Sequence, residues 1–205
     1  MDFMKQKAKR HLSGSWWVYL LVGLFFVAGL VFGALGVSVL DAETNSALGD
    51  FVNQGISQLN DNLSFAVTTK QAVMKNLYNL VKIFFLGMTI LGFPLILIII
   101  FTRGFALGFT IAFLIREKAL RGGALALLAV LPPNLLSLPA YILAAVSAIN
   151  FTLYLIRGRD GQRNIPISQY LLGYMIMMTL FGLLLISAAF IEGYLSPVMI
   201  RLLSE

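Results

Sequence analysis

The chain has 205 residues, of which 59% are hydrophobic and only 12% are charged. Because a soluble domain usually carries about 25% charged residues, this sequence has too few charges to form a water-soluble surface. It predicts an all-α, polytopic integral membrane protein, a helical bundle of about five transmembrane or re-entrant helices. The net charge of +6 does not indicate a nucleic-acid partner, because bases beside apolar spans follow from the positive-inside rule.

The first span is predicted over residues 16–40, which carry no charge. Residues 1–15 form a basic tail, which predicts a cytoplasmic N-terminus and contact with anionic membrane lipid. The apolar run is longer than the roughly 7–15 residues of a signal-peptide core, so we expect a retained helix.

Residues 41–69 contain four acidic residues and no Lys or Arg, which predicts an acidic outer loop. Apolar residues recur in it every three or four positions, a pattern typical of an amphipathic helix that lies on lipid or on a partner protein. These candidate partner-binding residues are Leu48, Val52, Ile56, Leu59 and Leu63.

The second span is predicted over residues 70–101, after a capping box at Thr68–Gln71. Asn79 and Lys82 are the intramembrane polar residues of this span. Lys82 either extends to the outer interface or faces a polar cavity with Asn79, as a residue of a transporter does.

Two further residues mark the end of this span. Pro94 would kink the helix or end it early. Arg103 is expected to anchor the chain at the cytoplasmic surface.

Residues 104–131 are predicted to be either a third span or a re-entrant segment, because charges at 116–121 interrupt the apolar run. A span places these charges outside, whereas a re-entrant segment returns them to the cytoplasm. A candidate helix break follows at Pro132, Pro133 and Pro139. The break is either a turn between two helices or a broken helix that exposes its backbone to a substrate.

The remainder is predicted as span 4 over 134–156, a basic cytoplasmic loop over 157–167, span 5 over 168–191 and an external tail over 192–205. The C-terminus is external in either interpretation of the middle region. Residues 1–205 thus form a single membrane domain.

Two pairs of residues are candidates for helix packing or for a homodimer contact. Gly104 and Gly108 have the spacing that allows close helix approach, and Tyr170 and Tyr174 share one face of the last span.

The residues for catalysis are missing from the sequence, which contains no cysteine and one histidine, His11. No catalytic, cofactor-binding or metal-binding set is predicted, so we expect a protein that is not an enzyme and has no cofactor.

The run Arg103-Gly-Phe-Ala-Leu-Gly-Phe, followed by Leu131-Pro-Pro-Asn and Leu138-Pro-Ala, resembles the stage II sporulation protein M family. The resemblance covers essentially the whole chain. It implies a non-catalytic membrane scaffold that recruits and organises the peptidoglycan-degrading stage II sporulation proteins P and D. The implied place is the mother-cell membrane at the sporulation septum, where the bacterial forespore is engulfed.

The residues themselves leave an alternative from another class, the membrane subunit of an ATP-driven transporter or permease. Its basis is Asn79 with Lys82, the charged interruption at 116–121 and the proline break.

Overall fold

The computed structural model describes residues 2–41, 43–44, 46–50, 65–125, 130–157 and 166–204. Side chains are described within this part for 16–41, 43–44, 46–50, 69–116, 130–156 and 166–194. The elements are α1 (Asp2–Gly36), the 3-10 helix η1 (Val37–Val39), α3 (Phe65–Gly87), α4 (Gly92–Leu125), α5 (Leu131–Arg157) and α6 (Ile167–Ser204).

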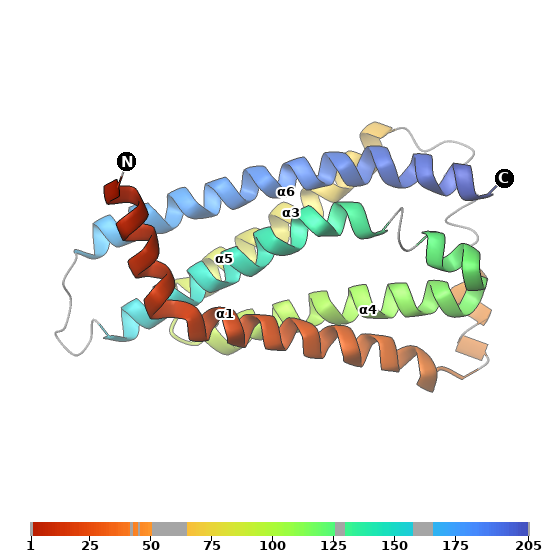
Figure 1. The fold of residues 1–205 in the computed structure, drawn as a ribbon, viewed down its shortest axis with the longest axis horizontal. Helices are drawn as coiled ribbons and strands as arrows, with labels where there is room; N and C mark the ends of the chain where they lie inside the picture. Colours follow the sequence, from red (N-terminus) through yellow and green to blue (C-terminus); the bar gives the residue numbers. More distant parts are fainter. Residues whose placement is uncertain are drawn as a thin grey trace.

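The five long helices run back and forth along one bundle axis (Figure 1). α1, α4 and α6 run in one direction, and α3 and α5 return. We call the end that holds the chain's N-terminus the N-terminal end, and the opposite one the C-terminal end. The turn between α3 and α4 lies at the N-terminal end, whereas α1 ends and α6 finishes at the C-terminal end.

Among the described residues, four segments are long and apolar enough to cross a membrane: Trp16–Val39, Gly92–Arg116, Leu131–Ile156 and Ile167–Tyr194. α3 is not among them, because it carries three lysines. It nevertheless lies antiparallel along α6, since Asn76 contacts Leu185 and Phe84 contacts Tyr174. The described chain is thus a polytopic helical membrane bundle. Within it, α3 lies at the same depth in the membrane as the apolar spans.

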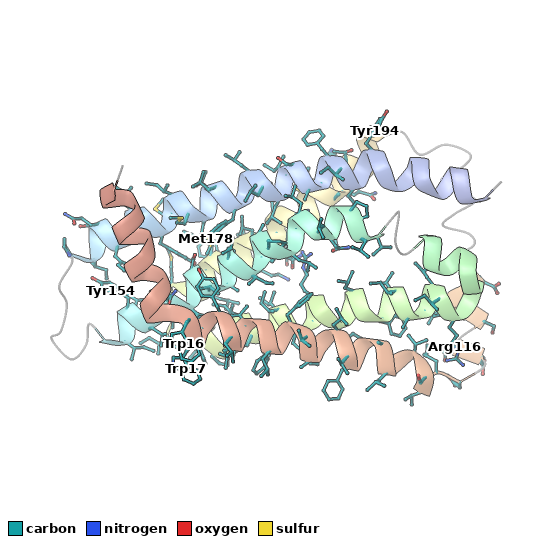
Figure 2. The ribbon with its side chains drawn as sticks, in the orientation of Figure 1. Trp16, Trp17, Arg116, Tyr154, Met178 and Tyr194 are labelled. Atoms are coloured by element: carbon teal, nitrogen blue, oxygen red, sulfur yellow. The ribbon has the colours of Figure 1, made fainter. Side chains whose placement is uncertain are left out.

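Apart from the face of α3, which carries exposed lysines, the outer surface of the described spans is apolar, as expected for a surface that faces lipid. On α6 alone, Leu172, Leu180 and Leu183 are half or more exposed. Exposed Trp16 and Trp17 lie near the N-terminal end, as Figure 2 shows. Tryptophan is enriched at membrane interfaces, so this pair marks one boundary of the hydrocarbon layer.

α1 and α4 run parallel and touch backbone to backbone through glycines. A Cβ atom on Gly104 would lie 2.2 Å from the carbonyl oxygen of Phe26, and one on Gly108 would lie 2.0 Å from that of Leu30. Gly29 and Gly33 approach α4 equally closely from the α1 side. Two small-xxx-small pairs thus face each other, which is the pattern that allows helices to approach closely in lipid.

The predicted second span over 70–101 is wrong in its boundaries. α3 begins at Phe65, so Thr69 is not at its start but inside it, buried beside Gly193 of α6. The helix ends at Gly87 and α4 begins at Gly92. Of the two interpretations of Pro94, the early end is correct: the proline lies in the first turn of α4, where its missing N–H costs nothing.

The end of α3 has all of its last four carbonyl groups hydrogen-bonded, although no helical residue follows to pair with them. The tyrosine hydroxyl of Tyr174 donates to Phe84 (3.0 Å), the amide of Met88 to Phe85 (3.1 Å), the amide of Thr89 to Leu86 (3.0 Å) and the hydroxyl of Thr152 to Gly87 (2.9 Å). Side chains from α5 and α6 therefore make a helix end possible within an apolar stretch.

α4 passes through the bundle as one helix, so the re-entrant interpretation of 104–131 is wrong. Arg116 lies at the C-terminal end (Figure 2) and donates a hydrogen bond to the carbonyl oxygen of Val37, where α1 has ended. A cation is favourable at the C-terminus of a helix. The basic residue that opens the 116–121 interruption thus has a structural partner at this end.

The candidate break at the prolines is the turn between two helices. Pro132 and Pro133 lie in the first turn of α5, where proline is tolerated, and Pro139 lies inside the helix. The last turns of α4 bend toward the start of α5 (Figure 1). No broken helix is found within the described span Leu131–Ile156.

Candidate functional site

A chain of polar side chains crosses the middle of the bundle and joins four helices. The Arg103 guanidinium of α4 donates to the hydroxyl of Tyr141 on α5 at 2.5 Å. That hydroxyl faces both the main-chain oxygen (3.0 Å) and the side-chain oxygen (3.1 Å) of Asn76 on α3. The Asn76 amide in turn donates to the carbonyl oxygen of Leu185 on α6 at 3.3 Å. We call Asn76, Arg103 and Tyr141 the polar cluster.

The polar cluster is buried except at its charged end. Tyr141 is 1% exposed and Asn76 is 4% exposed, whereas Arg103 is half-buried. The Arg103 carbon Cζ also lies 3.8 Å from the centre of the Tyr141 ring, so the hydrogen bond is combined with a cation–π contact. The carboxylate of Glu192 on α6 adds an electrostatic attraction to the guanidinium.

Arg103 is therefore not a cytoplasmic anchor, as the sequence had led us to expect. It lies eleven residues after Gly92, or about 16 Å along α4, which is near the middle of the Gly92–Arg116 segment. A charge near the bilayer centre costs about 2.5–3.5 kcal/mol on insertion scales, and such a residue commonly marks a functional position. The contacts with Tyr141 and the attraction to Glu192 offset part of that cost.

The predicted pair Asn79 and Lys82 does not face a cavity. The Asn79 amide donates to the main-chain oxygen of Lys75 in its own helix at 2.9 Å. Lys82 is exposed on the outside of α3, where its ammonium lies 4.1 Å from the centre of the Tyr78 ring. It also lies close to the N-terminal end of the bundle, five residues before α3 ends.

The candidate packing residues all contact neighbouring helices of the same chain. Gly104 and Gly108 face α1. Tyr174 is buried, and its ring stacks between Phe84 (5.3 Å) and Phe151 (4.6 Å). Tyr170 stacks on Tyr154 of α5 with ring centres 4.0 Å apart.

The predicted amphipathic loop is only partly within the described residues. Ser46–Asp50 is helical, and Leu48 is half-buried. Val52, Ile56, Leu59 and Leu63 lie outside the described residues, as do the side chains of Glu117 and Lys118. Among the side chains that the structure describes, no three His, Cys, Asp or Glu groups come together as a metal-binding set would.

The sequence contained a signal for Asn76, which was overlooked in favour of Asn79 and Lys82. The buried residues of α3 recur every three or four positions, and this stripe is Thr69, Ala72, Asn76, Leu80, Ile83 and Gly87. An asparagine on an otherwise apolar helical stripe must find partners inside the bundle. This pattern predicts that Asn76, rather than Asn79, is the polar residue inside the bundle.

Comparison with known proteins gives one family. The family model described as stage II sporulation protein M matches residues 22–197, which include the polar cluster, both α1–α4 glycine pairs and the start of α5. No curated protein and no solved structure matches the chain significantly. Because the match covers most of the chain and the described fold is a multi-pass helical bundle, this protein belongs to the stage II sporulation protein M family and is a sporulation-related membrane protein.

Proposed function

We propose that this chain is a non-catalytic scaffold in the mother-cell membrane at the sporulation septum. It recruits and organises the peptidoglycan-degrading stage II sporulation proteins P and D, so that the forespore can be engulfed. The observation that carries the proposal is the family match over residues 22–197. The fold supports it, because the described residues form membrane helices and leave no soluble domain of their own.

The proposal includes an orientation. The N-terminal end, with the basic tail 1–15 and Arg157, faces the cytoplasm, and the C-terminal end faces outward. The acidic segment 41–50 and the end of α6 then lie on the side where peptidoglycan is found. These are the segments from which hydrolases outside the membrane would be held.

The test is to replace Val52, Ile56 and Leu59 together by serine. We expect the variant to insert normally and to lose co-purification with the two hydrolases and septal localisation, because the apolar stripe of the outer loop is removed. The matched control replaces Gln54, Gln58 and Asn62 by serine in the same loop and should keep both properties. Unchanged recruitment in the first variant would remove this loop from the proposal.

A second candidate function is favoured by one observation, the half-buried Arg103 at mid-depth. Intramembrane cations mark substrate pathways in many transporters, so the chain would be the membrane subunit of an ATP-driven permease. Two of the three observations behind this alternative are lost, since Lys82 faces outward and Pro132 lies in the first turn of a helix. Purification with native partners separates the two functions: an ATPase would indicate transport, and cell-wall hydrolases would indicate the scaffold.

A further inference from the structure

The outward face of α3 differs from every other outward face in the described spans. Its exposed residues recur along one side of the helix and include three lysines among apolar and aromatic side chains. We call this set the lysine face: Lys70, Gln71, Met74, Lys75, Tyr78, Val81, Lys82 and Phe85. The other outward faces, such as that of α6, carry large apolar residues suited to lipid.

Lys75 lies at the depth of the polar cluster but points the opposite way. Its neighbour Asn76 is hydrogen-bonded to Leu185 within the α6 span. From Lys75 to Gly87, where α3 ends, is twelve residues, or about 18 Å of helix. This is longer than a lysine side chain. Toward the other end, Thr69 lies beside Gly193, next to the end of the α6 span at Tyr194, and it is six residues or about 9 Å of helix from Lys75. That distance also exceeds the length of a lysine side chain, so the Lys75 ammonium does not reach water at either end by extending along the surface.

The described residues supply no counter-charge for Lys75. In the part of the chain that the structure describes, the one carboxylate within a membrane span is that of Glu192. It attracts the Arg103 guanidinium inside the bundle, away from the outward face of α3. Lys82 finds a partner in the Tyr78 ring, whereas exposed Lys75 has neither an ion pair nor a ring beneath it among the described residues.

We propose that the lysine face binds a transmembrane helix of a partner protein, and that this helix carries an acidic side chain that pairs with Lys75. Charge complementarity selects this occupant: lipid tails cannot solvate an ammonium, and a second copy would bring lysine against lysine with no carboxylate at that depth. Met74, Tyr78 and Phe85 supply the apolar contact around the ion pair. The inference deepens the proposed function, because it rests on the chain holding another membrane protein.

The first experiment uses a defined probe in phosphatidylcholine vesicles. The probe is a dye-labelled synthetic helix of leucine and alanine, about 20 residues long, with one central glutamate, and its twin carries glutamine instead. A Tyr194→Cys variant of the full chain provides one dye site, because the protein has no native cysteine. We expect energy transfer with the glutamate probe, at least about tenfold weaker transfer in the Lys75→Met variant, and retained transfer in Lys75→Arg.

The second experiment locates the native contact. A benzoyl-phenylalanine crosslinker replaces Tyr78 in cells that make the full chain, and Leu183 is the depth-matched control, since it is exposed on the other side of α6. Tyr78 should crosslink to a membrane segment that contains Asp or Glu, Lys75→Met should abolish this product, and Leu183 should yield none of it. Unchanged thermal unfolding of the Lys75→Met variant shows that its fold is intact.

Three results would overturn the inference: equal transfer with both probes, a crosslinked segment without an acid, or crosslinks to lipid or to a second copy alone. The same experiments distinguish failure of this inference from failure of the proposed function. If the hydrolases co-purify while Tyr78 crosslinks only to lipid, the scaffold stands and the lysine face is wrong. If Tyr78 crosslinks to an acid-bearing helix of an unrelated protein and the hydrolases do not co-purify, the lysine face stands and the recruitment of hydrolases is wrong.

Discussion

The hydroxyl of Thr152 on α5 donates a hydrogen bond of 2.9 Å to the carbonyl oxygen of Gly87, the last residue of α3. Both groups are buried, and Thr152 is 0% exposed. The bond fixes the depth at which α3 stops and turns into α4. It also gives α5 a role in defining a boundary more than sixty residues earlier in the chain.

We therefore expect Thr152→Val to destabilise the protein by about 1–3 kcal/mol, because it leaves a buried carbonyl without a donor. The measurement is the free energy of unfolding in mixed detergent micelles. The control is Thr179→Val, since the hydroxyl of Thr179 is exposed and bonds only within its own helix. Equal effects of the two substitutions would contradict the assigned role.

The close α1–α4 contact predicts that even one methyl group is harmful at Gly104. A Cβ there would lie 2.2 Å from the Phe26 oxygen, so Gly104→Ala must move two backbones apart, at a cost of about 1–3 kcal/mol. Gly173→Ala is the matched control, because a Cβ at that position meets no atom within 4 Å. It should leave stability unchanged or raise it by about 0.5–1 kcal/mol through helix propensity.

The polar cluster predicts energetic coupling between Arg103 and Tyr141. In a double-mutant cycle with Arg103→Met and Tyr141→Phe, we expect a coupling free energy of about 1.5–3 kcal/mol, typical of a hydrogen bond to a charged group. The reference pair is Thr102→Val with Tyr141→Phe, because the Thr102 hydroxyl bonds to Ile98 on the exposed side of α4. That pair should be additive within about 0.5 kcal/mol.

The proposed orientation predicts a labelling pattern for single cysteines in intact cells. Ser46→Cys and Lys118→Cys should react with a membrane-impermeant thiol reagent from outside, and Ser168→Cys should react only after the cells are opened. The reason is that α4 crosses the bundle without a break and α6 begins at the N-terminal end. Protection of Lys118→Cys in intact cells would contradict the outward position of the 116–121 charges.

Hydropathy alone was enough for the class of fold. The segments around 134–156 and 168–191 each lie within a described helix, and 16–40 covers the rest of α1, then η1 and Leu40. Long apolar runs have few alternatives to a spanning helix. The boundary between α3 and α4 was not accessible in this way. The turn residues Met88–Leu91 are themselves largely apolar, and the groups that make the turn possible, Thr152 and Tyr174, come from distant sequence.

The same misplacement explains why the polar cluster was missed. Ending the second span at 101 put Arg103 at a membrane surface, where a lone arginine is unremarkable. Starting α4 at Gly92 moves it to mid-span, where it requires partners. Tyr141 gave no signal of its own, since a single tyrosine in an apolar helix is compatible with either burial or an interface.

The parallel pairing of α1 with α4 also constrains the order of assembly. α1 emerges first from the ribosome, yet the backbone it fits is not made until Phe101–Gly108 has been synthesised. α3, the least apolar long helix, likewise waits for Leu185 and Tyr174, which follow it by about a hundred residues. We therefore expect α1 to lack its backbone partner until α4 has been made, and α3 to lack its partners until α6 has been made, so that the bundle is complete only after α6.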